Sequence, residues 1–155
     1  MTATVTVREI AERIQGTNEN LTNVIDRLRN WTKEGLLAPE GEKHPGTGRT
    51  RRYPQAAVAQ ALLLTVLTEA IGMQATKAHT FAALFDLAKK WLTSGVGQGH
   101  LMIIGRSRSG GASEIQVVRS HAVREALEKS IHQVHIVIDL GKVYASLNQP
   151  AGETS

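Results

Sequence analysis

The hydrophobic pattern at the start of the chain predicts an amphipathic helix over residues 6–14. Four apolar residues recur there at the spacing of one helical face: Val7, Ile10, Ala11 and Ile14. Thr6 is a suitable N-cap because Glu9, three residues later, can complete a capping box with it. Gly16 is expected to end the helix, because glycine adopts the left-handed conformation without a steric penalty.

A second helix is expected to begin between residues 18 and 22 and to run to about Glu34. Its buried stripe consists of apolar residues at helical spacing: Leu21, Val24, Ile25, Leu28 and Trp31. The polar residues off this stripe are expected to face outward: Arg27, Arg29, Asn30 and Lys33. Gly35 then stops the helix, and Leu36 and Leu37 fold back onto the core.

Residues 39–54 have the composition of a loop or of a two-stranded wing, with glycines at 41, 46 and 48 that favour turns. Residues 43–53, called the basic segment below, contain four cations and no acid. The cations are Lys43, Arg49, Arg51 and Arg52. Taken alone, this segment is equally well explained as a solvated loop that carries positive charge.

Two further helices are predicted, over residues 55–70 and 75–92. Pro54 suits the first turn of the helix over 55–70, because the missing N–H of proline has no partner there in any case. This helix is apolar on most sides, which favours a place in the core or at a subunit interface. The helix over 75–92 carries the aromatic residues Phe81, Phe85 and Trp91, which would serve either the core or a dimer contact.

The residue pattern changes from helical to strand-like after residues 94–99, where three glycines predict a flexible hinge. Residues 101–104, 115–118 and 133–140 are expected to form strands, with a helix over 120–130, in the order β-β-α-β. The expected fold class is therefore α+β. A mainly helical N-terminal domain covers residues 1–93, a small α+β dimerisation or interaction domain covers 100–147, and 148–155 form a flexible tail.

Composition narrows the class of protein. The formal net charge is +4, which mildly favours a polyanionic partner. The absence of cysteine excludes a disulfide scaffold and a thiolate zinc site. The first residues do not have the pattern of a signal peptide, and the longest apolar run, residues 56–67, is too short to cross a bilayer. We therefore expect a soluble, cytoplasmic protein without a membrane partner.

Two motifs carry a resemblance to a known family. Residues 28–37 read Leu-Arg-Asn-Trp-Thr-Lys-Glu-Gly-Leu-Leu, and Arg51-Arg52-Tyr53 precede the next helix. They resemble the Leu-Arg-x-Tyr/Trp-x-x-x-Gly-Leu-Leu and Arg-x-Tyr stretches of MerR-family regulators, over about residues 6–92. The resemblance implies a winged helix-turn-helix whose second helix enters the major groove of DNA. It also implies that Arg51 and Tyr53 hold phosphates, while the tip of the wing lies near the minor groove.

The candidate DNA-binding residues follow from this resemblance and from side-chain chemistry, because guanidinium groups reach phosphates and guanine edges and asparagine can read adenine. They are Arg27, Arg29, Asn30, Lys33, Lys43, Arg49, Arg51, Arg52 and Tyr53. The segment from Gly16 to Leu28 is longer than the tight turn of the family, and recognition uses the N-terminal end of a helix. The alternative base readers are Asn18, Asn20, Thr22 and Asn23.

Other motifs give weaker indications of a function. The loop from Gly105 to Gly111 lacks the spacing of a phosphate-binding loop, so a hairpin turn is expected there, with a second DNA contact as the alternative. Three histidines, His121, His132 and His135, lack the acid or cysteine that would complete a metal site. We find no nucleophile-base-acid set and expect neither an enzyme nor a cofactor.

The sequence thus predicts a DNA-binding transcription regulator of a bacterium or phage, located at the nucleoid. A homodimer is expected, because one winged helix buries too little surface for tight specific binding. The family's long dimerising coiled coil is missing here, so contacts must come from the helix over 75–92 or from the C-terminal domain, which is also a candidate site for a protein partner. Two alternatives remain: an architectural, excisionase-like or partition-like DNA-binding protein, and a winged-helix adaptor that binds an acidic protein.

Overall fold

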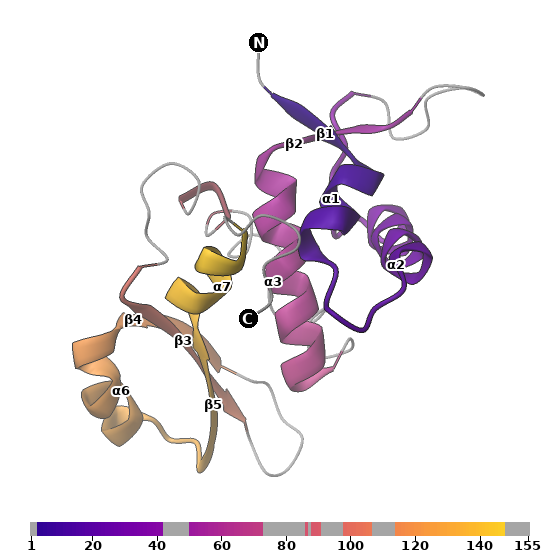
Figure 1. Cartoon of the computed structure of the whole chain (residues 1–155). Helices are drawn as coiled ribbons and strands as arrows, with labels where there is room; N and C mark the ends of the chain where they lie inside the picture. Colours follow the sequence, from indigo (N-terminus) through magenta and orange to yellow (C-terminus); the bar gives the residue numbers. More distant parts are fainter. Residues whose placement is uncertain are drawn as a thin grey trace.

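The computed structural model describes residues 3–41, 50–72, 86, 88–90, 98–106 and 114–147. Within these ranges the fold is mixed α+β, as expected, with a two-stranded and a three-stranded sheet. The elements, shown in Figure 1, are β1 (Thr4–Thr6), α1 (Val7–Ile14), α2 (Leu21–Lys33), β2 (Arg52–Pro54), α3 (Ala56–Ile71), β3 (His100–Arg106), β4 (Glu114–Arg119), the short 3-10 helix η1 (Ser120–Ala122), α6 (Val123–Lys129), β5 (Val134–Asp139) and α7 (Leu140–Leu147).

Different side chains stabilise the two ends of helix α1. The expected capping box is present: Glu9 N donates to Thr6 Oγ1 at 3.2 Å, and Thr6 N donates to Glu9 Oε2 at 2.6 Å. The helix ends at Ile14, just before Gly16 as expected, but the left-handed conformation expected of Gly16 is wrong, because this glycine does not have a positive φ. The connection to α2 is instead held by Glu19, whose carboxylate accepts from Gly16 N at 3.1 Å.

Helix α2 has the predicted stripe and the predicted stop. Asn20 is its N-cap, with Oδ1 accepting from Thr22 N at 2.8 Å. Gly35 takes a φ of +79° after the last turn, and Leu36 N then donates back to Trp31 O at 2.8 Å. Leu36 and Leu37 are consequently buried, as the sequence indicated.

Strands β1 and β2 form a small antiparallel sheet next to α1, with Val5 opposite Tyr53 and Thr6 opposite Arg52. Arg52 also forms an isolated antiparallel bridge with Glu40, so the end of the basic segment lies beside the chain that precedes it. The expectation for Pro54 is wrong: it is the last residue of β2, and α3 begins only after Gln55. Helix α3 is buried on most of its surface and is the central helix of the core.

The C-terminal sheet has the order β4-β3-β5, with both neighbours antiparallel to β3. The predicted order β-β-α-β is present, but β3 extends through Gly105 and Arg106, which we had expected in a loop. Helix α7 was not expected. It contacts both β3 and α3, and a single cluster of buried hydrophobic residues extends from α1 to Leu140 at the start of α7. Figure 1 shows α7 between α3 and the sheet, and α6 at the far side of the sheet.

Some predicted features lie outside the described residues. These are Phe81, Phe85 and Trp91, most of the glycine-rich stretch 94–99, the residues 107–113 between β3 and β4, and the tail from residue 148. Residues 86 and 88–90 are helical, within the helix predicted over 75–92. None of the described helices combines the length and the hydrophobicity needed to cross a bilayer.

Candidate nucleic-acid interface

The outward face of α2 is polar. Its buried side consists of Val24, Leu28, Trp31 and Thr32. Its exposed residues are Thr22, Asn23, Asp26, Arg29, Asn30 and Lys33. Most of the candidate readers on this helix are therefore accessible, although the acids Asp26 and Glu34 share their surface. An open hollow of about 370 Å³ lies here, lined by Asn23, Asp26, Arg27, Asn30, Trp31 and Glu34.

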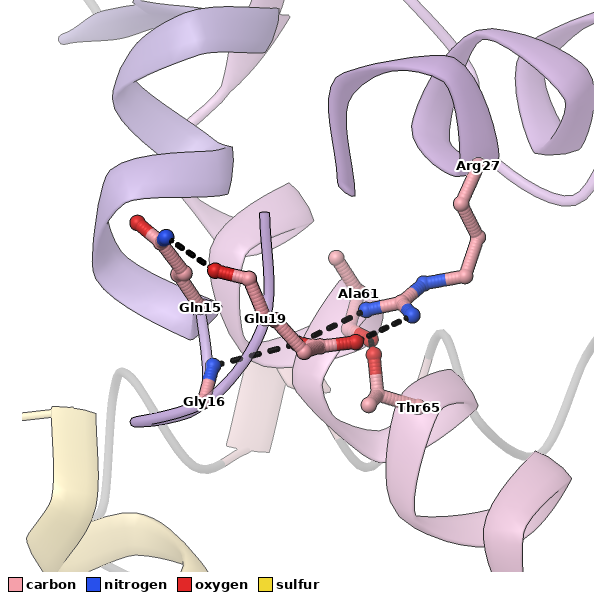
Figure 2. Close-up of polar contacts among 6 residues, drawn as sticks. All are labelled: Gln15, Gly16, Glu19, Arg27, Ala61 and Thr65. Carbon is pink, nitrogen blue, oxygen red and sulfur yellow. Dashed lines mark hydrogen bonds and ion pairs between the residues drawn. The ribbon is translucent and has the colours of Figure 1, made fainter. Parts of the chain in front are cut away.

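Arg27 does not face outward freely, contrary to expectation. Its Nη1 lies 2.7 Å from Glu19 Oε1, its guanidinium lies 5.6 Å from the centroid of the Trp31 ring, and its side chain is 27% exposed. Figure 2 shows Arg27 reaching from α2 toward Glu19, which also contacts Gln15 and Gly16 at the end of α1. Arg27 therefore links α2 to the connection that follows α1, and its guanidinium is already engaged by Glu19 and Trp31 in this arrangement.

The pKa of Glu19 is lowered from its ordinary value of 4.5, mainly by the hydrogen bond from Arg27 and then by the N–H of Gly16. Both donors favour the carboxylate form, so Glu19 carries its charge when it holds the connection between the helices. Thr65 of α3, also drawn in Figure 2, donates instead to Ala61 O of its own helix at 2.9 Å.

Two other candidate readers have local partners. Arg29 Nη1 lies 3.2 Å from Asp26 Oδ1, and both side chains are well exposed. Such exposed pairs contribute little free energy, so Arg29 can exchange Asp26 for another anion. The amide of Asn20 is committed to capping α2 and is a structural group rather than a free reader. Asn23, Asn30 and Lys33 remain as exposed side chains on the same helix.

The base of the basic segment is fixed to α2 by two hydroxyl groups. Tyr53 is only 1% exposed, and its hydroxyl oxygen lies 2.9 Å from Thr32 Oγ1, which also donates to Leu28 O. The expectation that Tyr53 holds a phosphate therefore does not fit its position in the core. Gln60 of α3 makes a further link, because its Nε2 donates to Leu36 O at 2.6 Å just beyond α2.

Next to Tyr53, the side chain of Arg52 is exposed and that of Arg51 is half-buried. Arg52 lies opposite Thr6, the N-cap of α1. The pKa of the nearby Glu9 is lowered, first by the backbone N–H and hydroxyl of Thr6 and to a smaller degree by Arg52. Lys43 and Arg49, the other two cations of the basic segment, lie outside the described residues.

Sequence reasoning missed the partners that hold this surface together: Glu19, Thr32 and Gln60. A signal existed for Thr32, whose hydroxyl stands one turn after Leu28 next to the apolar stripe, where it can bond a backbone carbonyl. The pairing of Glu19 with Arg27 and that of Gln60 with Leu36 had no local signal, because the partners are eight and 24 residues apart.

Two histidines of the C-terminal part, His132 and His135, have structural partners. His135 Nε2 lies 2.8 Å from Ser130 Oγ, which also accepts from His132 N, so the hydroxyl closes the turn between α6 and β5. The ring of His132 lies over Gly105, where a Cβ would come within 2.5 Å of it. Within the described ranges, no group of three or more potential metal ligands comes together.

Comparison of the sequence with known protein families and with curated proteins gives no match.

Proposed function

We propose that the protein binds duplex DNA in a sequence-specific manner, as a dimeric transcription regulator. The elements β1, α1, α2 and β2 act as a winged helix-turn-helix of MerR type. Helix α2 enters the major groove, and the basic segment lies along the phosphate backbone as the wing.

The contact between Tyr53 and Thr32 is the observation that carries this proposal. It joins the strand that leaves the basic segment to the last turn of α2, 2.9 Å between the two oxygens. A buried bond between hydroxyls fixes direction as well as distance. The end of the basic segment is thereby held against α2, so that Arg52 next to Tyr53 and the exposed face of α2 can contact flanking phosphates and a groove at the same time.

The charges on α2 favour base contacts over phosphate contacts for this helix. Arg27 is paired with Glu19, Arg29 with Asp26, and Glu34 is exposed at the end of the helix. Phosphates are repelled by such acids, whereas asparagine can bond both N6 and N7 of adenine. Asn23 and Asn30 are therefore assigned to base reading, and Arg52 to phosphate contact.

Selection from a random duplex library at roughly physiological salt tests this function. The expected result is a motif with two inverted half-sites, one for each copy of the chain. Recovery of bound duplexes that share no motif would favour an architectural DNA-binding protein instead. No recovery even at low salt, where phosphate contacts are strongest, would contradict DNA binding and favour an adaptor that binds an acidic protein.

Two variants separate the assigned roles. Arg52→Ala should weaken binding to every sequence and reduce the salt dependence of affinity by about one unit, because one phosphate contact is lost. Arg124→Ala is the matched control, because Arg124 is a 92% exposed cation on α6, outside the proposed interface. Asn30→Ala should instead reduce the preference for the selected motif by roughly 1–3 kcal/mol and leave non-specific affinity unchanged. Equal affinities and salt slopes for wild type and Arg52→Ala would remove the phosphate role.

A further inference from the structure

Strand β5 forms an open edge of the C-terminal sheet. In the order β4-β3-β5, only one side of β5 is paired, and no other described strand covers its outer side. Edge strands expose a row of backbone donors and acceptors, and proteins usually protect them with lysine, proline or a bulge. Residues 134–139 read Val-His-Ile-Val-Ile-Asp, so the strand itself carries neither lysine nor proline as protection.

The exposed side chains along this edge are two valines and, at its end, Asp139. Val137 is 46% exposed and Val134 is 47% exposed, whereas Ile103, the neighbour of Val137 on β3, is 1% exposed. On the opposite edge, Gln116 of β4 occupies the same row, since it also pairs with Ile103. The two edges therefore differ at the central position of this row, which is apolar on β5 (Val137) and polar on β4 (Gln116).

We propose that β5 pairs with β5 of a second copy of this chain, antiparallel and centred on Val137. In this register Val137 lies opposite Val137 of the second copy, and Ile136 lies opposite Ile138. His135 lies opposite Asp139, on the same face as Val137, so each end of the pair joins an imidazole to a carboxylate.

The register follows from the residues. A slip of two residues, which centres the pair on Ile136, places His135 opposite Val137 and Asp139 opposite Gln133, so both the charge complementarity and the Val137 pair are lost. Asp139 Oδ1 accepts from Lys142 N at the start of α7, which leaves Oδ2 for the imidazole. His135 Nε2 is bonded to Ser130 Oγ, which leaves Nδ1 on the other side of the ring.

The paired strands form one six-stranded sheet with a twofold axis through its centre. Ile136 and Ile138 belong to or pack against the main hydrophobic cluster of each copy, so the two cores meet across the axis. This dimer supplies the two copies that the proposed function requires, and to that extent it rests on the proposed function. The pairing itself involves no residue of α2 or of the basic segment.

A single cysteine tests the pairing directly, because the chain has none of its own. Cα atoms opposite each other in an antiparallel pair are about 4.5–5.5 Å apart, which is within the range that a disulfide spans. Under mild oxidation and without DNA, most of the Val137→Cys protein should become a covalent dimer. Gln116→Cys, in the same row at the other edge, should remain monomeric on a denaturing gel.

A second pair of variants measures the unlinked dimer by light scattering after size exclusion. Wild type and Gln116→Lys should have twice the mass of one chain, and Val137→Lys should have the mass of one chain, because two ammonium groups would meet at the axis. Circular dichroism establishes whether each variant is folded. If Val137→Lys does not fold, the cross-linking of Val137→Cys compared with Gln116→Cys tests the pairing. A monomeric wild type, a folded dimeric Val137→Lys, or equal cross-linking of the two cysteine variants would overturn the pairing. Library selection measures DNA binding separately, so the two proposals can fail independently.

Discussion

Glu19 shows how one side chain decides the geometry of a surface. Its carboxylate accepts from Gly16 N and from Arg27, and its carbonyl oxygen accepts from Gln15 Nε2. These bonds join the end of α1 to the middle of α2, and they turn the Arg27 guanidinium over Trp31. A residue outside every recognisable motif therefore determines how Arg27 is placed on α2.

Replacement of Glu19 should change stability in a pH-dependent way. Because the pKa of Glu19 is lowered in the folded protein, the stabilisation is complete above its ordinary value of 4.5 and is lost as pH falls through the lowered value. Glu19→Gln should lower the free energy of unfolding by roughly 1 kcal/mol at neutral pH, and the difference from wild type should shrink in acid.

Urea unfolding at several pH values measures this difference. Glu12→Gln is the control, because it removes only an exposed pair with Arg8 and should have almost no effect. A difference between Glu19→Gln and wild type that stays constant from neutral to acid pH would contradict the assigned role.

At the scale of elements, α2 is positioned by how it begins and ends. The amide of Asn20 satisfies a backbone N–H at its start, and Gly35 reverses the chain at its end. The reversal brings Leu36 under the helix, where Gln60 of α3 bonds its carbonyl oxygen. The glycines that follow the two helices therefore have different roles: Gly35, after α2, needs its left-handed conformation, and Gly16, after α1, does not.

Alanine substitution should distinguish these two glycines. Gly35→Ala should destabilise the protein by about 1–2 kcal/mol, because an L-residue is strained at a φ of +79° even though no atom obstructs the Cβ. Gly16→Ala should be neutral or slightly stabilising, because its Cβ would make only an ordinary contact of 3.5 Å with Glu19. Thermal unfolding of both variants measures the difference. An equal loss of unfolding free energy in Gly35→Ala and Gly16→Ala would contradict a conformational role that belongs to Gly35 and not to Gly16.

At the scale of the whole molecule, α7 joins the N-terminal helices to the C-terminal sheet. Leu140 is fully buried at its first turn, and Val143, Tyr144 and Leu147 pack against the same hydrophobic cluster. The cluster includes residues from α1, α2 and α3 as well as from β3 and β5. The hydrophobic contacts across α7 should therefore couple the unfolding of the two parts.

Truncation of Leu140 tests this coupling. In a Trp91→Phe background, Trp31 of α2 is the single tryptophan and reports on the N-terminal part. Leu140→Ala should lower the unfolding midpoint seen by Trp31 fluorescence, with a loss of about 2–5 kcal/mol, because a buried leucine leaves a cavity. Lys142→Ala, an exposed position of α7, is the control. A Trp31 midpoint unchanged by Leu140→Ala would show that the parts unfold independently.

Local spacing was enough to predict the elements whose causes lie within a few residues. The capping box of α1, the apolar stripe of α2, the stop at Gly35 and the strand at residues 134–139 all follow from neighbours at short separation. The exposed positions of Asn23, Asn30 and Lys33 follow from the same periodicity, because an amphipathic helix has one buried side.

Packing between distant segments decided the environment of the other site residues and of the sheet edge. Tyr53 has the sequence context of a phosphate ligand, but its hydroxyl is used by Thr32, 21 residues away. Arg27 has the periodicity of an outward residue, but Glu19 lies within its reach only after the chain turns between α1 and α2. Among the described strands β5 has β3 as its one neighbour, and the chain continues from β5 into α7, which packs on β3 and α3. A pattern in the sequence indicates which faces must be buried, whereas the partner that buries each face depends on the free energy of the whole assembled core.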